Sequence, residues 1–495
     1  MVRQKQLRLL LFTTIAWLSI AAWYVIGGNG VITLNVVDEE GLPVAGAIIA
    51  AGDTELARTD ATGNAEIEWS RSDDELVVDA PGYATETFSV TEPSEEPVTV
   101  RLNSQILRGV VRDAEGRPVP GVYVASGYGQ AVSGDDGRFL VKLAEPGQVE
   151  VFRPAWQPAG YTWDGSPGET TIVIEPRVVK AVHIAGDVPS DPQRWQHQLD
   201  LADQTELNGV MLDLKDEDGF IFYDSEVEIA RESGSVRAEW DLAEVVSELD
   251  QRGIYVIGRL AAFQDPKSAK VFPDMAVLDA NTGRPYQKAG QYFLDPSDQE
   301  ARRYALDLAL EACLAGVDEI QFDYIRFPDG FPNSAVFDAA TGTDMRDSQD
   351  MRISTIESFM LEARATLHPQ GCAVAADIFG FITTAQDDGG IGQKWSSVTD
   401  ALDVVSPMVY PALYSRDWYG YERPFDHPGA IVDNALSDGI ERLDSGAIIR
   451  PWLQDWAYTD EQVRAQIESA EKYGLGWMLW NPFSNVSSGA LDEAP

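Results

Sequence analysis

The stretch "DEIQFDYIRFP", residues 318–328, has the pattern of a β-strand that lies inside a protein. Side chains alternate between the two faces of a strand. One face carries Ile320, Phe322 and Tyr324, and the other carries Gln321 and Asp323. A buried carboxylate is costly unless it is paired or hydrogen-bonded. Asp323 therefore needs either a partner inside the protein or a chemical role.

Seven further apolar runs accompany this stretch, and helical patterns such as 241–253 and 300–316 lie between them. The eight strand candidates are 178–184, 208–214, 254–260, 317–325, 372–380, 403–410, 448–456 and 475–481. Eight strands that alternate with helices are typical of a (β/α)8 TIM barrel, which we predict for residues 177–495. A doubly wound α/β sheet is the alternative, but no glycine-rich phosphate-binding sequence follows the first strand.

Upstream of the barrel, the sequence contains an internal repeat. "VVDEEGLPVAGAIIAA" (36–51) matches "VVRDAEGRPVPGVYVAS" (110–126), and short β-type runs alternate with Gly, Pro and Asp turns in both copies. This pattern predicts two small all-β sandwich domains, at residues 31–102 and 103–176. The repeat resembles carboxypeptidase regulatory-like domains of the transthyretin type. That resemblance implies a spacer or a weak binding module.

The N-terminal segment, residues 1–30, has the pattern of a signal anchor. Basic residues at positions 3, 5 and 8 precede an uncharged, mostly apolar stretch at about 9–26. Such a stretch is just long enough to cross a bilayer, with the basic flank on the cytoplasmic side. We therefore expect a single-pass protein of the cell membrane with its bulk outside the cytoplasm. A cleaved signal peptide is the alternative, although no A-x-A-like site follows the stretch.

The composition is strongly acidic. The 80 acidic residues oppose 37 basic ones, for a formal net charge of −43, and only nine of the basic residues are lysine. Such a charge repels nucleic acid and anionic lipid headgroups, so we expect neither as a partner. Acid excess with few lysines indicates a high-salt habitat, in which screening removes the self-repulsion. A plain acidic surface explains the same numbers, and both readings stay open.

Cysteine and histidine are scarce. Cys313 and Cys372 precede consecutive predicted strands, and we expect two buried free thiols, with a disulfide as the alternative. The four histidines form neither an H-x-H nor an H-E-x-x-H sequence, so we expect no metal and no cofactor. The acidic segment 213–219 lacks the full set of calcium ligands and is interpreted as a turn.

Candidate site residues gather at the ends of the predicted strands, where TIM barrels hold their active sites. The strand-end residues are Asp213, Arg259, Asp323, Asp377, Tyr410, Gln454, Asp455, Trp480 and Asn481. One such aspartate is usually a helix cap, but four at the same edge favour a chemical site. Gln321, Arg326 and Trp418 lie nearby in the sequence and complete the predicted substrate-binding set.

Two of these carboxyl groups suit glycosidic hydrolysis. Neighbouring strands lie about 4.8 Å apart, so Asp323 and Asp377 can approach the roughly 5–5.5 Å that a retaining mechanism needs. We predict Asp323 as nucleophile and Asp377 as general acid/base. An inverting pair, with roughly 6.5–9.5 Å between the groups, would instead join Asp323 to Asp213 or Asp455.

Aromatic residues crowd the loops after the last three strands, as in "YPALYSRDWYGYERPF" (410–425). Flat rings in polar loops suit the faces of sugars, although about half are expected to pack on one another. The predicted partner is therefore a carbohydrate. Two alternatives stay open: a catalytically inactive carbohydrate-binding surface protein on the same barrel, and a structural protein of the cell envelope.

Several motifs in order strengthen this prediction: "TELNGVMLDLKDEDGFIFYDS", "YFLDPSD", "DEIQFDYIRFP", "AADIFGF", "IGQKW", "DVVSPMVYPALY" and "IRPWLQDW". Together they resemble a mostly bacterial family of predicted glycoside hydrolases of unassigned specificity, which implies a TIM barrel and O-glycosyl hydrolysis. In amylase-type barrels the corresponding strands carry the nucleophile and the acid, in agreement with Asp323 and Asp377, although that acid is normally Glu. Met408 and Tyr410 are similar to a chitinase motif, but Ile325 occupies the position of the chitinase Glu.

Overall fold

The computed structural model describes residues 30–494 apart from 70–74, 91–95, 339–344 and 347. The predicted membrane span at 9–26 lies outside the described residues. Within the described ranges, no helix combines the length and the apolar character that a bilayer crossing requires. Two compact units are present, one formed by residues up to 152 with 158–174, and the other by 153–157 with 175–495.

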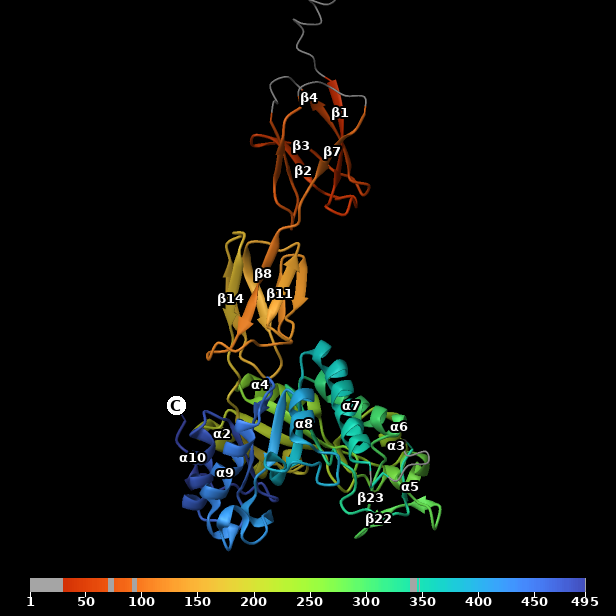
Figure 1. Cartoon of the computed structure of the whole chain (residues 1–495), viewed down its shortest axis with the longest axis vertical. Helices are drawn as coiled ribbons and strands as arrows, with labels where there is room; N and C mark the ends of the chain where they lie inside the picture. The colour runs from red at the N-terminus through yellow and green to blue at the C-terminus, as the bar shows by residue number, and fades with distance from the viewer. Residues whose placement is uncertain (1–29, 70–74, 91–95, 339–344, 347, 495) are drawn as a thin grey trace, which may run out of the picture. The chain divides into compact units, whose positions relative to one another are not determined.

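The larger unit contains a closed barrel of eight parallel strands (Figure 1). These are β15 (Lys180–Ile184), β16 (Gly209–Lys215), β19 (Tyr255–Ala261), β24 (Glu319–Asp323), β26 (Ala373–Phe379), β27 (Val404–Met408), β29 (Trp452–Gln454) and β30 (Trp477–Trp480). Each strand pairs with its sequence neighbours in the barrel, and β15 pairs with both β16 and β30 to close it. The predicted TIM-like barrel is confirmed.

Helices surround the strands in the order that the sequence patterns predict (Figure 1). They are α2 (Pro192–Gln204), α3 (Glu228–Glu232), α4 (Leu242–Gln251), α5 (Ser268–Val271), α6 (Gln299–Leu314), α7 (Gln349–Leu367), α8 (Trp395–Ala401), α9 (Pro428–Glu441) and α10 (Asp460–Glu471). Asp241 and Asp298 accept hydrogen bonds from backbone N–H groups of the first turns of α4 and α6, so each helix begins at a capping aspartate.

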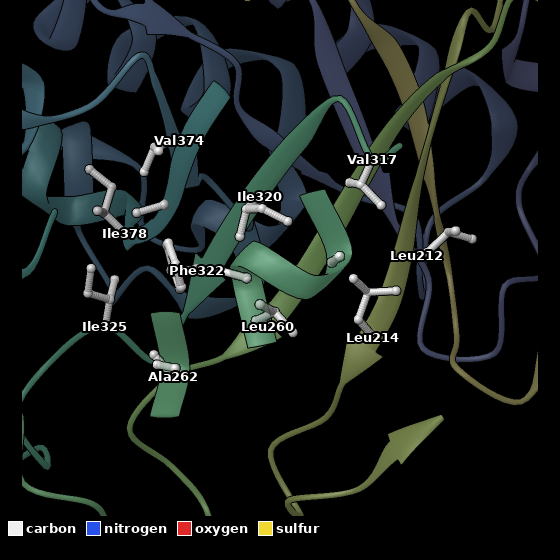
Figure 2. Close-up of a cluster of buried hydrophobic side chains, with 14 of the residues drawn as sticks. Leu212, Leu214, Leu260, Ala262, Val317, Ile320, Phe322, Ile325, Val374 and Ile378 are labelled. Atoms are coloured by element: carbon white, nitrogen blue, oxygen red, sulfur yellow. The ribbon is translucent and has the colours of Figure 1, made fainter. Parts of the chain in front are cut away.

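The main core lies between the strands and the helices, because alternate strand residues point out of the barrel. Figure 2 shows Ile320 and Phe322 of β24 beside Leu260 of β19 and Val374 of β26, and all four are buried. The opposite face of β24 points into the barrel and carries Glu319, Gln321 and Asp323. All five residues of β24 are buried, so the alternation in "DEIQFDYIRFP" separates a core face from a polar interior face.

Short strands lie outside the barrel wall. β28 (Ile448–Ile449) pairs with β27, and β17 (Ile221–Tyr223) and β18 (Val236–Trp240) extend the sheet beyond β16. The others form small sheets in loops: β20 (Leu278–Asp279), β21 (Arg284–Pro285), β22 (Gln287–Lys288), β23 (Gln291–Tyr292) and β25 (Ala335–Val336).

The smaller unit contains the two predicted all-β domains, which share one topology. The first pairs β4–β1–β7 and β3–β2–β5–β6, and the second pairs β11–β8–β14 and β10–β9–β12–β13. Gly41 and Gly116, at matching turns of the repeat, have φ of +84° and +82°, which side chains other than glycine rarely adopt. The internal repeat of the sequence is therefore a repeat of structure. The likeness to carboxypeptidase regulatory-like domains stays a prediction.

The strands of these domains are β1 (Gly30–Val37), β2 (Ile48–Ala51), β3 (Thr54–Arg58), β4 (Asn64–Trp69), β5 (Leu76–Asp79), β6 (Glu86–Phe88), β7 (Val98–Arg101), β8 (Ile106–Arg112), β9 (Tyr123–Ser126), β10 (Gly129–Val132), β11 (Arg138–Lys142), β12 (Gly147–Phe152), β13 (Ala159–Trp163) and β14 (Glu169–Val173). The first domain buries a core of its own, which includes Ile32, Leu34, Ile49 and Val78.

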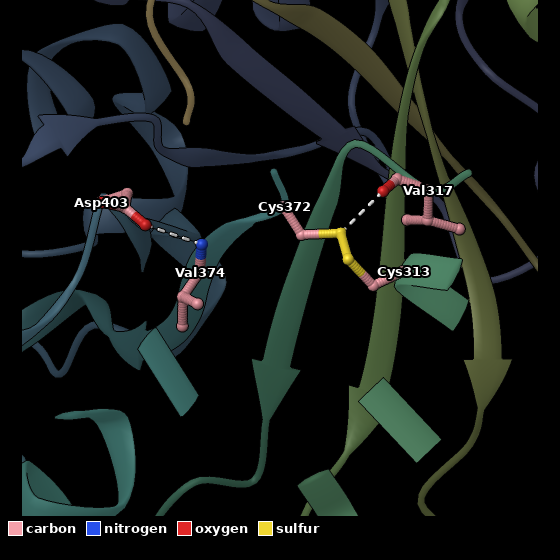
Figure 3. The surroundings of a disulfide bond; sticks show 5 residues. All are labelled: Cys313, Val317, Cys372, Val374 and Asp403. Carbon is pink, nitrogen blue, oxygen red and sulfur yellow. Dashed lines mark hydrogen bonds between the residues drawn. A yellow bond between two sulfur atoms is a disulfide. The ribbon is translucent and has the colours of Figure 1, made fainter. Parts of the chain in front are cut away.

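The prediction of two free thiols is wrong. Cys313, in the last turn of α6, forms a disulfide with Cys372, directly before β26, and their Cα atoms lie 6.1 Å apart (Figure 3). The sulfur of Cys372 lies 3.0 Å from the carbonyl oxygen of Val317. Because α6 leads into β24, and β24 is the neighbour of β26, the barrel itself brings the two cysteines together. Cysteine number alone could not distinguish this from two buried thiols.

Candidate active site

Polar side chains from neighbouring strands converge at the carboxyl end of the barrel. The strand register aligns Asp213 with Arg259, Arg259 with Gln321, and Ala261 with Asp323. Residues paired in a parallel sheet point to the same face, so these side chains enter the barrel interior together. The site is thus positioned by the closure of the barrel rather than by one loop.

Arg259 is the centre of this cluster and is only 2% exposed. Its Nη1 donates to Asp213 Oδ1 at 2.7 Å, and its Nε donates to Asp323 Oδ2 at 3.0 Å. Nη2 donates to the same Asp323 oxygen and also lies 3.4 Å from Glu217 Oε2. Asp377 Oδ2 lies 3.9 Å from Nε. One guanidinium therefore contacts carboxylates from three barrel strands and one loop.

Asp377 has a different environment from Asp323. Its Oδ1 accepts hydrogen bonds from the Gln321 amide and the Trp452 indole N–H, whereas Oδ2 faces Arg259 without a close hydrogen bond. Burial, and then the charge of Asp323, raise the pKa of Asp377 well above its usual range. Because Oδ1 already accepts two hydrogen bonds and Oδ2 accepts none at close range, a proton on Asp377 belongs on Oδ2.

The separation of Asp323 and Asp377 has an upper bound. Their Oδ2 atoms lie 3.0 and 3.9 Å from the same nitrogen of Arg259, so the two oxygens cannot be farther apart than these distances combined. This bound includes the roughly 5–5.5 Å of retaining glycosidases and excludes all but the low end of the roughly 6.5–9.5 Å of inverting enzymes.

Asp213 is held between Arg259 and a histidine. His183 Nε2 lies 2.8 Å from Asp213 Oδ2, and His183 Nδ1 lies 2.8 Å from the carbonyl oxygen of Asn481. Burial alone would raise the pKa of Asp213, but the charges of Arg259 and His183 lower it to about 2. The sequence patterns did not indicate His183 as a site residue, because a single histidine within an apolar run matches no motif.

Trp480 forms one wall of the cluster. The His183 ring stacks on the Trp480 ring with 3.9 Å between centroids, and the Arg259 guanidinium lies 5.0 Å from the centroid of the same ring. Trp452 meets Trp480 edge to face. The predicted aromatic residue Trp480 therefore belongs to the cluster, with Trp452 beside it.

The backbone turns sharply directly after Asp323. Tyr324 has φ of +51°, a left-handed conformation that is uncommon for a side chain of this size. Its N–H donates to Asp323 Oδ1 at 2.6 Å, so the turn gives Asp323 a further hydrogen bond. Strained residues of this kind are concentrated at functional sites.

Several predicted substrate-binding residues lie outside the Arg259 cluster. Gln454 accepts a hydrogen bond from the N–H of Ala412 and donates to the carbonyl of Trp456. Asp455 accepts from the N–H of Ser487, and Asn481 donates to the carbonyl of Asp455. Through these hydrogen bonds, the three side chains stabilise the loops that follow β27, β29 and β30.

Three other predicted residues lie among aromatic rings. Tyr410 is buried with its ring edge-on to Trp456, and Trp418 packs edge-on against Tyr414. The Arg326 guanidinium lies 5.3 Å from the centroid of the Tyr324 ring. Burial and then the charge of Asp377 raise the pKa of Tyr410, so its hydroxyl stays protonated at neutral pH.

Among the residues that the structure describes, no group of three or more His, Cys, Asp or Glu side chains is arranged to hold a metal ion. Within the cluster, the guanidinium of Arg259 lies between Asp213 and Asp323 and donates hydrogen bonds to both carboxylates.

Comparison with known proteins gives one family match. The sequence profile of a family described as "Putative glycosyl hydrolase domain" matches residues 181–485, more than half of the chain. No protein of curated function matches the chain.

Solved structures resemble parts of the chain. A hypothetical protein from Ruminiclostridium thermocellum is 33% identical, over 40% of this chain and 96% of its own, with a TM-score of 0.35. The glycoside hydrolase domain of PgaB (BpsB) from Bordetella bronchiseptica is 16% identical, over 62% of this chain and 95% of its own, with a TM-score of 0.47. The glycoside hydrolase domain of PelA from Pseudomonas aeruginosa is 12% identical, over 63% and 96%, with a TM-score of 0.37.

Proposed function

The chain belongs to the family described as a "Putative glycosyl hydrolase domain", and from this membership we propose that its barrel cleaves glycosidic bonds with retention of configuration. The substrate is an oligosaccharide or polysaccharide. Asp323 is the nucleophile, and Asp377 is the general acid and base.

The observation that carries this proposal is the contrast between the two carboxyl groups around Arg259. Asp323 accepts two hydrogen bonds from the guanidinium, which hold its carboxylate in place as a nucleophile. Asp377 is buried beside that negative charge, which raises its pKa well above the usual range and favours the protonated form that a general acid needs. Two carboxyl groups with opposite protonation states are what acid-assisted nucleophilic displacement needs.

The reaction then proceeds in two steps. Asp377 gives its Oδ2 proton to the glycosidic oxygen while an Asp323 oxygen bonds to the anomeric carbon and the bond to the leaving group breaks. In the second step, Asp377 takes a proton from water, whose oxygen attacks the same carbon and releases Asp323. The upper bound on the distance between the two carboxyl groups supports this retaining order.

One exposed ring and several half-buried rings in the loops at the barrel's carboxyl end favour a sugar substrate. Phe483, in the loop after β30, is 78% exposed. Phe425 and Tyr458, from the loops after β27 and β29, stack on each other, whereas Trp418 packs within the first of these loops. Flat apolar surfaces beside a polar cluster suit the two kinds of surface on a sugar ring.

We also propose that the protein is anchored in the cell membrane by residues 9–26, with its bulk outside the cytoplasm. The basic flank and uncharged span support the anchor. The buried Cys313–Cys372 disulfide supports an oxidising compartment, because such bonds are rare in the cytosol of ordinary organisms.

The test is the hydrolysis of a panel of glycans and aryl glycosides by the full chain and three variants. Asp323→Asn should lose several orders of magnitude in turnover, because no covalent intermediate forms. Asp377→Asn should retain much of its first-step rate only on aryl glycosides, whose leaving groups need little acid assistance.

Asp318→Asn is the matched control. Asp318 precedes the same strand at the opposite end of the barrel, where it accepts a hydrogen bond from the N–H of Val256. Its variant should keep wild-type turnover. Near-normal turnover of Asp323→Asn, with the fold intact, would contradict the proposed nucleophile.

A further inference from the structure

The two polar contacts of the His183 ring determine where hydrogens must lie. One hydrogen is on Nδ1, and another lies between Nε2 and its partner Asp213. Nδ1 lies 2.8 Å from a backbone carbonyl oxygen, that of Asn481, which can only accept, so Nδ1 carries a hydrogen. Nε2 lies 2.8 Å from Asp213 Oδ2. If Nε2 had no hydrogen and Asp213 were ionised, two acceptors would face each other in a buried site. The pair therefore holds one proton more than a neutral histidine and a carboxylate.

The surroundings of His183 decide where that proton lies. The groups that face its ring are the carboxylate of Asp213 from β16, the Asn481 carbonyl after β30, and the Trp480 ring from β30. None of these three groups carries a positive charge, and the cation of the cluster, Arg259, contacts the other oxygen of Asp213. An electron-rich aromatic face and a carboxylate both favour a cationic ring. The depressed pKa of Asp213, which results despite burial, agrees with an ionised carboxylate.

Resting on the proposed function, we infer that His183 is a positioning residue that acts, as an imidazolium, through Asp213 and Arg259 on the nucleophile Asp323. The imidazolium balances Asp213, which leaves the charge of Arg259 for Asp323. The buried set of His183, Asp213, Arg259 and Asp323 is then neutral as a whole.

Without this second cation, the guanidinium of Arg259 would have to balance the charges of two buried carboxylates. Arg259 donates Nη1 to Asp213, and Nε and Nη2 to Asp323. Uncompensated buried charge is strongly unfavourable, so loss of the imidazolium would pull Arg259 toward Asp213 or force a proton onto one of the aspartates. In either case Asp323 would lose orientation or ionisation. The effect falls on the chemical step more than on sugar binding.

The first test needs no substrate. Nitrogen-15 NMR of the imidazole groups in the purified full chain, with the His183→Gln variant to assign the signals, reports the hydrogens on both ring nitrogens. From the two hydrogen bonds of the ring, we expect both nitrogens of His183 to be protonated at pH 7. A neutral tautomer at pH 7 would overturn the inference, whether or not the proposed reaction is correct.

The second test is kinetic and uses a matched histidine. His368 also faces a buried aspartate, with Nε2 2.7 Å from Asp403 Oδ2, but this pair lies at the amino end of the barrel. His183→Gln should lower kcat by about 10–100-fold with little change in KM, the cost expected of a displaced catalytic group. His368→Gln should leave both constants unchanged.

A double variant separates positioning from general damage. If His183 acts through Asp213, adding His183→Gln to Asp213→Asn should cause little further loss, because the coupled residues are not additive. Fully additive losses, or unchanged kcat in a folded His183→Gln, would overturn the inference. Failure of the proposed function would instead appear as undiminished turnover of Asp323→Asn, with the NMR result for His183 unaffected.

Discussion

Removal of the Cys313–Cys372 disulfide should destabilise the barrel by an amount that follows from its position in the chain. The bond joins cysteines 59 residues apart in the sequence. In the chain-entropy treatment, closing a loop of that length removes about 4 kcal/mol of conformational freedom from the unfolded chain. For a domain of this size, such a change lowers the melting temperature by roughly 6–8 °C.

Two independent perturbations test this value. One is reduction of the full chain, with thiol titration to confirm that the bond is open, and the other is the Cys313→Ala/Cys372→Ala variant. Thermal melts followed by tryptophan emission report mainly on the barrel, where most tryptophans lie. Both samples should melt lower than the oxidised protein by similar amounts, and reductant should not change the variant further.

Two outcomes would refute the reasoning. Free thiols in the protein purified from an oxidising compartment would contradict the bond itself. Equal melting temperatures for the oxidised and fully reduced protein would show that the segment between α6 and β26 is already ordered in the unfolded chain, so that the bond constrains nothing.

Both thiol sites are buried, so reduction should require partial unfolding, and brief exposure to reductant under native conditions should leave the bond intact.

Four further predictions concern charge and location. Asp377 has a raised pKa, so the folded protein binds its proton more tightly than the unfolded chain, and stability should fall as pH rises from about 4 through that pKa; urea midpoints of Asp377→Asn should lack this decline. Glu217, whose side chain is 40% exposed, should tolerate Glu217→Gln with a stability change within about 0.5 kcal/mol, and a larger fall in its urea midpoint would indicate that Arg259 depends on it. If the net charge of −43 is an adaptation to salt, the melting temperature should rise up to molar NaCl, whereas a flat curve would favour a plain acidic surface. Protease treatment of intact cells should release the part beyond residues 9–26, and full protection would contradict the anchor.

The sequence predicted the barrel well because each of its strands lies in a short apolar run with a polar residue at or near the carboxyl end. The alternation around Asp323 correctly separated the core face, with Phe322, from the interior face. The meeting of Arg259 with Asp213 and Asp323 depends on the register between strands, and residue spacing within one strand does not determine that register. Strand ends could therefore be named as candidates, whereas their partners could not.

The same limit explains what the sequence did not reveal. His183 lies one strand away from Asp213, and only the closure of the barrel brings its other nitrogen to Asn481. Gln454 and Asp455 follow the strand pattern of the site, yet their hydrogen bonds go to loop backbone. The position of a residue at a strand end indicates which end of the barrel it occupies. It does not distinguish a reacting group from a side chain that holds a loop in place through hydrogen bonds.

The sharing of Arg259 by carboxylates from separate strands has a consequence for mutational history. Replacement of Arg259 alone would leave Asp213 and Asp323 buried without their common counter-charge, at about 3–5 kcal/mol for each broken pair. Loss of Arg259 as the first step is therefore closed to a chain that must stay folded. A descendant that loses the arginine must first, or at the same time, lose the aspartates. In related chains that no longer conserve this site, Arg259, Asp213 and Asp323 should be lost together. A chain that keeps only the arginine or only an aspartate at these positions would be an intermediate between the complete cluster and its loss.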